Sequence, residues 1–222
     1  MRHRLTLVRQ RIQRACERSR RDPSSVTLVC VTKAVPADVV DQIVALGVTD
    51  LGENRVQEAK QKREVLIGHR SSVRWHLIGH LQRNKTRMAA KLFDVVHSVD
   101  SVELVQVLDR HAARPLDVLV QVNVSGETTK FGCRPEEAGA VAQQILRTAH
   151  LRLAGLMTIA PLSDDPESAR PVFRRLRQLR DGLGLPVLLR LSMGMSQDFE
   201  VAIEEGADLV RVGTALFGAR GT

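Results

Sequence analysis

The sequence predicts one (β/α)8 barrel of the TIM type, preceded by an extra N-terminal helix. Apolar runs that are typical of buried strands alternate with helical stretches eight times along the chain. A chain of 222 residues with 43% hydrophobic content is also long enough to bury a core of barrel size. An open, doubly wound sheet is the alternative, because periodicity alone does not distinguish a closed sheet from an open one.

The first 21 residues predict an amphipathic helix, because apolar residues such as Leu5, Val8 and Ile12 recur near the helical period. Eight strands are then expected at Thr27–Thr32, Asp50–Gly52, Arg74–Ile78, Val95–Val99, Asp117–Asn123, Arg152–Met157, Val187–Leu191 and Leu209–Val212. Helices are expected between them at Ala37–Leu46, Arg55–Leu66, Lys85–Leu92, Val102–Ala113, Pro135–Thr148, Pro166–Leu183 and Gln197–Glu205. Prolines near helix starts and glycines after helix ends support these boundaries. We expect residues 1–222 to form a single domain.

The formal net charge of +8 raises the question of a nucleic acid partner. Much of the excess lies in residues 1–21 and in Phe173–Arg180, which are typical of helices with a solvated basic face. The aromatic residues that stack on single-stranded bases are few, with no tyrosine and one tryptophan. A mitochondrial transit peptide is a second interpretation of residues 1–21, against which Glu17 and Asp22 argue. We expect no nucleic acid partner.

The cellular compartment follows from apolar segments and cysteines. No apolar stretch approaches the roughly 20 residues that span a bilayer, and the N-terminus lacks the apolar core of a secretory signal. The three cysteines, Cys16, Cys30 and Cys133, are odd in number and widely spaced, which argues against a disulfide framework or a zinc knuckle. We expect a cytoplasmic protein without a membrane partner. No apolar repeat indicates a partner surface, so we expect a monomer.

Lys33 is the first candidate for chemistry, because it ends the apolar run VTLVCVTK. Desolvation at a strand end lowers the pKa of an amine and prepares it to attack an aldehyde. The alternative is a surface lysine whose stem covers apolar atoms. Only six of the 33 basic residues are lysines, and the other five lie in polar sequence surroundings: Lys60, Lys62, Lys85, Lys91 and Lys130. A lysine in an apolar run is therefore less typical of the surface here.

Two late segments, Leu191–Ser196 and Val210–Gly218, supply groups that suit a phosphate. Ser192 and Ser196 offer hydroxyls, and Gly213-Thr214 opens a predicted helix whose N–H groups favour an anion. Phosphate capture after strands 7 and 8 recurs in TIM barrels. A lysine for an aldehyde and a site for a phosphate together predict a pyridoxal 5'-phosphate (PLP) site. Polar residues that follow the predicted strands meet at the same mouth: Lys33, Glu53, Asn54, His80, Ser98, Asn123, Thr158, Ser192, Gly213 and Thr214.

His76 and His80 form an H-x-x-x-H pair that raises the question of a metal. This spacing brings two ligands together only on a helix, whereas RWHLIGH predicts a strand that runs into a loop. We expect no metal site. For His80, a position facing the cofactor and a histidine satisfied by backbone both stay open.

From Val26 to Arg220 the chain resembles the pyridoxal phosphate homeostasis proteins, also called the PLP-binding protein family, through VCVTKAVP, LGENRVQEA, WHLIGHLQRNK, HSVDS, QVNVSGETTKFG, GLMTIAP and LSMGMSQDFEVAIEEGADLVRVGTALFGAR. The resemblance implies a TIM-type barrel like the N-terminal domain of alanine racemases. It implies that Lys33 carries PLP as an aldimine. It also implies a protein that buffers PLP or delivers it to PLP-dependent apo-enzymes, without catalytic turnover.

The resemblance further implies that Arg211 lies near the pyridine nitrogen and that Ser192, Gly213 and Thr214 hold the phosphate. An arginine that is always protonated cannot protonate the ring nitrogen, so the ring is a poorer electron sink. The alternative for Arg211 is a strand-end ion pair with Glu204, Glu205 or Asp208.

Asn54 and Met157 are expected to line the pocket, with a loop-capping amide and an ordinary core side chain as the alternatives.

An enzyme is the competing hypothesis, most plausibly an amino acid racemase that uses PLP. The alanine racemase route needs a tyrosine on the face of the cofactor opposite the lysine, and this sequence has no tyrosine. A third hypothesis is a phosphate-binding barrel enzyme in which Lys33 is the catalytic amine. We expect the PLP carrier and assign no catalytic residue.

Overall fold

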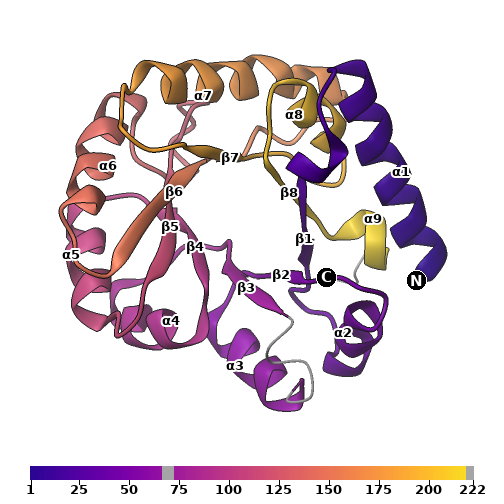
Figure 1. Cartoon of the computed structure of the whole chain (residues 1–222), viewed down its shortest axis with the longest axis horizontal. Coiled ribbons are helices and arrows are strands. Elements are labelled where there is room, and N and C mark those ends of the chain that lie inside the picture. Colours follow the sequence, from indigo (N-terminus) through magenta and orange to yellow (C-terminus); the bar gives the residue numbers. More distant parts are fainter. Residues whose placement is uncertain (67–72, 219–222) are drawn as a thin grey trace.

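The computed structural model describes residues 1–66 and 73–218, and its centre is a closed barrel of parallel strands (Figure 1). The strands follow one another around the barrel in chain order, and β8 closes it against β1. Their bounds are β1 (Thr27–Val31), β2 (Asp50–Glu53), β3 (Arg74–Leu77), β4 (Val95–Val99), β5 (Leu116–Gln121), β6 (Leu151–Met157), β7 (Arg190–Ser192) and β8 (Leu209–Val212). The closed barrel confirms the predicted fold and excludes the open sheet.

Helices surround the barrel between successive strands (Figure 1). Their bounds are α1 (Arg2–Arg18), α2 (Ala37–Val44), α3 (Val56–Val65), α4 (Thr86–Leu92), α5 (Val102–His111), α6 (Ala138–Leu146), α7 (Arg170–Gly182), α8 (Phe199–Glu204) and α9 (Thr214–Phe217). Helices such as α2 and α5 turn an apolar stripe toward the barrel, because their buried residues recur at helical spacing. Within the described residues, no helix has the length and apolar character needed to cross a membrane.

Helix α1 is the extra helix, and it packs against α8 and α9 (Figure 1). It ends before residue 21, because Arg20 takes a left-handed conformation with φ of 54°. Arg11 pairs with Glu200 at 2.6 Å, and Arg21 donates to the carbonyl oxygen of Ala207 at 2.6 Å. These contacts attach the N-terminal segment to the last quarter of the chain.

Strand β7 differs from its predicted range Val187–Leu191. Leu188 is 92% exposed, and the strand runs only from Arg190 to Ser192, paired with Gly155–Met157 of β6. Gly155 permits this pairing, because a Cβ atom there would lie 1.9 Å from the carbonyl oxygen of Arg190. The shift places Ser192 inside the barrel wall and not in the loop after it.

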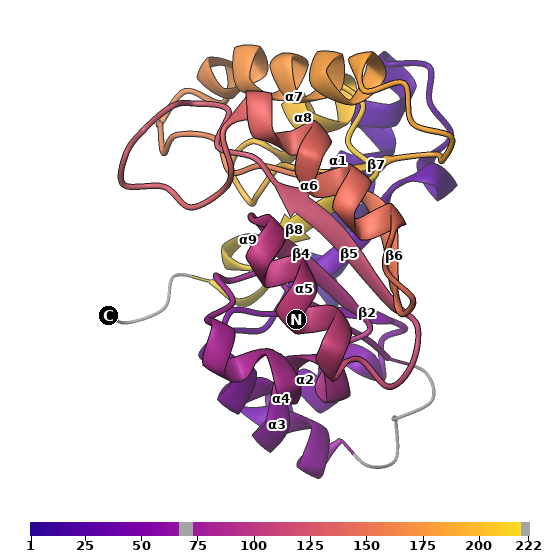
Figure 2. The ribbon, with the colours of Figure 1, turned by 90° about the vertical axis from the view of Figure 1, so that its left-hand side faces the viewer.

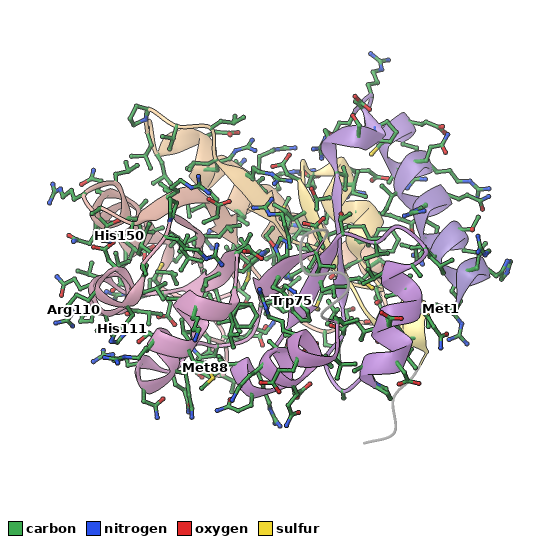
Figure 3. The ribbon with its side chains drawn as sticks, turned by 60° about the horizontal axis from the view of Figure 1, so that its bottom comes forward. Met1, Trp75, Met88, Arg110, His111 and His150 are labelled. Carbon is green, nitrogen blue, oxygen red and sulfur yellow. The ribbon has the colours of Figure 1, made fainter. Side chains whose placement is uncertain are left out.

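Buried apolar residues of the strands and helices form one main cluster, which includes Leu5, Ile43, Leu77, Phe173 and Phe199. Trp75, labelled in Figure 3, is 2% exposed and lies on β3 with the Arg63 guanidinium 5.7 Å from its ring centre. Its ring is therefore not available for stacking on a nucleic acid base. In the side view, the loop after β5 and helix α9 project on the same side of the barrel (Figure 2). That side carries the carboxyl ends of the strands.

Candidate functional site

A cavity of about 600 Å³ opens at the carboxyl ends of the strands. Its volume is in the range that holds small-molecule ligands and cofactors. Residues after β1, β2, β6, β7 and β8 contribute to its wall. Among them are six of the eight predicted site residues: Lys33, Asn54, Ser196, Arg211, Gly213 and Thr214.

Lys33 lies in a turn that leaves β1, where the Val35 N–H donates to the carbonyl oxygen of Thr32 at 3.0 Å. The side chain of Lys33 is exposed, so the expected desolvation was wrong. The chain has already left the barrel wall at this position, and Lys33 stands at the rim of the cavity. The next residue, Ala34, has φ of 54°, a conformation that costs a non-glycine residue roughly 1–2 kcal/mol. Its N–H donates to Glu58 Oε2 at 2.9 Å, which helps to hold this backbone.

A buried ion pair lies under this turn. The Lys62 Nζ atom is 2.6 Å from Glu53 Oε1 and donates to the carbonyl oxygen of Thr32, also at 2.6 Å. The Thr32 hydroxyl donates to the same Glu53 oxygen at 2.6 Å. Glu53 Oε2 is buried and has no hydrogen-bond partner among the described residues. Burial raises the pKa of Glu53 against the opposing effect of Lys62 and Thr32. Two charged side chains thus make hydrogen bonds to Thr32, the residue before Lys33.

The sequence neighbours of Lys62 are polar, yet the fold buries this residue, which is 6% exposed. Glu53 ends a strand and Lys62 lies on the following helix. No periodic pattern in the sequence links the two positions.

Ser196 joins the loop after β7 to the start of α9. Its Oγ atom accepts from the N–H groups of Gly213 and Ala215, each at 3.2 Å. The loop turns at Gly194, which has φ of 91° and whose Cβ would lie 2.5 Å from the Cβ of Ala202, so only glycine fits. One hydroxyl and two backbone N–H groups therefore meet at one corner of the cavity. Both N–H groups donate to Ser196 Oγ here, and the hydroxyl hydrogen of Ser196 is a donor that suits an anionic oxygen.

Arg211 lies on β8 and is 4% exposed, yet it reaches the cavity wall. It donates through NH1 to Ser192 Oγ at 2.7 Å and through NH2 to the carbonyl oxygen of Thr158 at 2.9 Å. Burial lowers its pKa to about 10, with Asp198 opposing, so the guanidinium stays charged at neutral pH. Within residues 1–66 and 73–218, no carboxylate forms a salt bridge with it.

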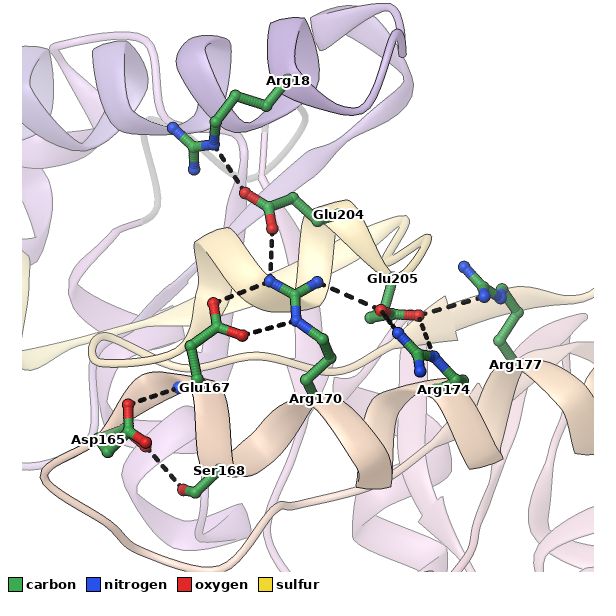
Figure 4. A network of polar contacts seen from close by, with 9 residues as sticks. All are labelled: Arg18, Asp165, Glu167, Ser168, Arg170, Arg174, Arg177, Glu204 and Glu205. Atoms are coloured by element: carbon green, nitrogen blue, oxygen red, sulfur yellow. Dashed lines mark hydrogen bonds and ion pairs between the residues drawn. The ribbon is translucent and has the colours of Figure 1, made fainter.

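The predicted ion-pair alternative for Arg211 was wrong, because the three carboxylates have other partners. Figure 4 shows Glu204 and Glu205 in a network at the outside of the barrel. Glu204 accepts from Arg18 and Arg170, each at 2.7 Å, and Glu205 lies within 3.2 Å of Arg170 and of two further arginines of α7, Arg174 and Arg177. Asp208 pairs with Arg21 at 3.0 Å.

Ser192 and Met157 lie behind the cavity wall. Ser192 is fully buried, and its hydroxyl lies between Arg211 and His97 Nδ1, the latter at 2.9 Å. Met157 is fully buried and packs with Val95 in a small apolar cluster. Neither residue contributes to the cavity wall as described. Ser192 is inside the wall because β7 ends one residue later than predicted and includes it. Met157 is an ordinary core side chain, which was the alternative given for it.

The two histidines of the H-x-x-x-H pair point to different groups. His76 is buried between Asp50 Oδ1 and His97 Nε2, each at 2.9 Å. His80 stacks on Phe131 with ring centres 4.0 Å apart. Across the described parts of the chain, no three His, Cys, Asp or Glu side chains come together as metal ligands would.

His97 is the residue that the sequence argument missed. It is fully buried in β4 and makes hydrogen bonds on both sides of its ring. The signal was a histidine inside the apolar run VVHSV, in a strand whose residues are all buried. A buried imidazole needs partners, so its position indicated a polar group inside the barrel.

The model of the alanine racemase N-terminal domain matches residues 4–221. The chain is 44% identical over 223 residues to the pyridoxal phosphate homeostasis protein of Aquifex aeolicus, covering 98% of this chain and 97% of that protein. It is 45% identical over 216 residues to the protein of the same name from Pseudomonas aeruginosa, covering 96% and 93%.

Solved structures agree with this similarity. PipY of Synechococcus elongatus without PLP superposes with a TM-score of 0.88 at 36% identity, covering 98% of this chain and all of that one. PipY with PLP bound gives a TM-score of 0.81 at 36% identity, covering 94% of this chain and all of that one. An alanine racemase from Corynebacterium glutamicum has a TM-score of 0.71 at 19% identity, covering 97% of this chain and 62% of that one. The last likeness is one of fold.

Proposed function

The chain belongs to the alanine racemase N-terminal domain family and, within it, to the pyridoxal phosphate homeostasis proteins, and on that premise we propose that it binds PLP and buffers or delivers it. The observation that carries the proposal is the cavity at the barrel mouth, which joins an exposed lysine, an arginine that makes no salt bridge within the described residues, and the corner of Ser196 and Gly213. PLP offers an aldehyde, a pyridine nitrogen and a phosphate, one for each.

Each group of the cofactor has a residue of this chain to hold it. Lys33 would hold the cofactor at its aldehyde, the group that an amine attacks. The corner of Ser196, Gly213 and Thr214 would hold the phosphate, and Arg211 would face the pyridine nitrogen. Asn54 also lines the cavity. A buried guanidinium is costly, and besides Asp198, which acts on Arg211 through its charge, the phosphate of a bound ligand would bring further negative charge to this cavity.

We assign no catalytic turnover to this site. The chain has no tyrosine to act as a second base, and Arg211 does not deliver a proton to the ring nitrogen. A carrier that hands PLP to apo-enzymes needs only binding and release. We place its work in the cytoplasm and expect residues 1–222 to act as one monomeric PLP-binding barrel.

The test is to trap PLP on the protein. Purified wild type with PLP should absorb as an imine, and borohydride should fix the cofactor on the Lys33 peptide, as read by peptide mass. Lys33→Ala should lose both signals and keep its melting temperature without cofactor. Lys60→Ala is the matched control, because Lys60 is an exposed lysine of α3 and lies outside the cavity wall. An adduct on another lysine in Lys33→Ala would refute the assignment.

A second arm tests the lack of turnover. The loaded protein should exchange the α-hydrogen of alanine or glutamate for solvent deuterium no faster than free PLP does. Rapid exchange that disappears in Lys33→Ala would establish an enzyme instead.

A further inference from the structure

A line of hydrogen bonds crosses the barrel interior from the cavity to the opposite strands. It runs from Arg211 on β8 to Ser192 on β7, then to His97 on β4, His76 on β3 and Asp50 on β2, with donor–acceptor distances of 2.7 to 2.9 Å. Every member is at most 9% exposed. We propose that His97 is a positioning residue, which acts through Ser192 to fix the guanidinium of Arg211 toward the bound cofactor. This inference rests on the proposed function.

The Arg211 end of the line sets the direction of the hydrogen bonds. A guanidinium has only donors, so Ser192 Oγ must accept from it. The single hydroxyl hydrogen of Ser192 then points to the His97 Nδ1 atom, its other neighbour along the line. Nδ1 of His97 accepts and carries no hydrogen, so in a neutral ring the hydrogen is on Nε2. That Nε2–H donates to Nδ1 of His76.

The Asp50 end requires the same direction. Its carboxylate accepts from Nε2 of His76, so this nitrogen carries the hydrogen, and Nδ1 of a neutral His76 accepts. Burial alone would raise the pKa of Asp50, but hydrogen bonds from His76 and Thr49 keep it below its ordinary value. The reverse direction would set a lone pair of His76 against an ionised carboxylate. Both ends therefore agree on one arrangement.

The arrangement holds only while both histidines stay neutral. Burial lowers the pKa of His97 well below its ordinary value, and His76, Arg211, Arg190 and Arg74 lower it further. Burial also lowers the pKa of His76, against the opposing effect of Asp50. The charge of Arg211 is thus linked to the charge of Asp50 through neutral groups, with no second cation between them.

The consequence for the site is a fixed guanidinium. With its own hydrogen committed to His97, Ser192 presents a lone pair to NH1, while the Thr158 carbonyl receives NH2. These two acceptors define the plane of the Arg211 side chain. The Arg211 side chain is therefore held in one rotamer before a ligand binds. Less conformational entropy is then lost when a ligand accepts from its remaining N–H groups.

The first test needs no cofactor. Long-range ¹H–¹⁵N correlation of the histidine rings at pH 7 should show His76 and His97 neutral, each with its hydrogen on Nε2. Assignment comes from His76→Asn and His97→Asn. A hydrogen on Nδ1 of either ring, or a doubly protonated ring, would overturn the proposal even if PLP binds as expected.

The second test compares two replacements of His97. In His97→Asn the amide oxygen stands where Nδ1 stood and still accepts from Ser192, whereas His97→Leu removes the acceptor. We expect His97→Leu to retain PLP roughly tenfold less well and to shift the pyridine ¹⁵N resonance of ¹⁵N-labelled PLP, because a hydrogen bond to a charged group is affected. His97→Asn should stay within about threefold of wild type.

Borohydride trapping on Lys33 separates the proposed PLP-binding function from the positioning role of His97. Absence of trapping in wild type would refute the proposed function, while the ring tautomers would still test the hydrogen-bonded line. Trapping in all three proteins, with retention and the pyridine resonance of His97→Leu equal to wild type, would refute the role of His97. If His97→Leu does not fold, the test uses His97→Asn and Arg211→Ala. The role of His97 would be refuted if His97→Asn changes the pyridine ¹⁵N resonance and lowers PLP retention as much as Arg211→Ala does.

Discussion

The barrel supports its two cationic cavity residues, Lys33 and Arg211, in different ways. Under Lys33, a full ion pair of Glu53 and Lys62 bonds to the backbone of the turn. Behind Arg211, neutral groups bond to the side chain itself, and the nearest carboxylate on the line, Asp50, is four hydrogen bonds away.

The difference matches the work proposed for each residue. A lysine that forms and releases a covalent bond has to move its side chain, so only the turn that carries it is held. An arginine that must face one ring atom gains from a side chain that is already oriented. The support under Lys33 is therefore an ion pair, whereas the support behind Arg211 is a line of neutral groups.

The largest expected effect comes from breaking the ion pair under Lys33. Lys62→Met leaves the Glu53 carboxylate buried without a cation, so the free energy of unfolding should fall by about 3–5 kcal/mol in urea titrations. Adding Glu53→Gln should recover most of this loss, because no buried charge then remains. Lys60→Met on the same helix is the control and should change stability by less than about 0.5 kcal/mol, since Lys60 is 56% exposed. Equal effects of the two single variants would contradict the assigned ion pair.

The line behind Arg211 predicts a dependence on pH. His97 has a folded pKa below its unfolded value near 6.5, so its stability contribution is complete above about pH 6.5 and is lost as the pH falls, because only the unfolded chain takes up the proton. Between pH 7 and 5, wild type should lose roughly 2 kcal/mol more than His97→Asn. Thermal or urea unfolding of both proteins over this range measures the difference.

The comparison of two proteins is needed because other buried groups titrate in the same window. Burial raises the pKa values of Glu53, Asp100 and Asp198, and these acids act in the opposite direction as the pH falls. They are common to both proteins and cancel in the difference. Parallel pH curves would mean that His97 is not held neutral.

The smallest effect is expected at the outer network of Figure 4. Arg174 is 52% exposed and pairs with Glu205 at 3.0 Å, while Arg170 and Arg177 remain within 3.2 Å of the same carboxylate. Arg174→Ala should therefore change the unfolding free energy by less than about 1 kcal/mol, and less still at high salt. A loss well above this value would contradict the expectation that Arg170 and Arg177 compensate for the missing Arg174 guanidinium.

Much of the fold could be predicted from the sequence, because strand and helix periods differ and the chain alternates between them eight times. The start of β7 could not, since Val187 and Leu188 are apolar but exposed, and the close approach of Gly155 to Arg190 decides the pairing. Strand ends identified the residues that reach the cavity. The partners behind Arg211 come from four different strands, and no local pattern in the sequence marks such a meeting.

The meeting of β1 with β8 has a consequence for how the protein is made. Arg11 and Glu200 are 189 positions apart, and the barrel wall is incomplete until its last strand joins its first. During synthesis Lys33 leaves the ribosome long before Arg211 and Gly213, so a nascent chain would offer the proposed amine without the proposed phosphate site. Contacts of such long range form late and slowly. On the proposed function, stable loading with PLP therefore requires a finished, closed barrel.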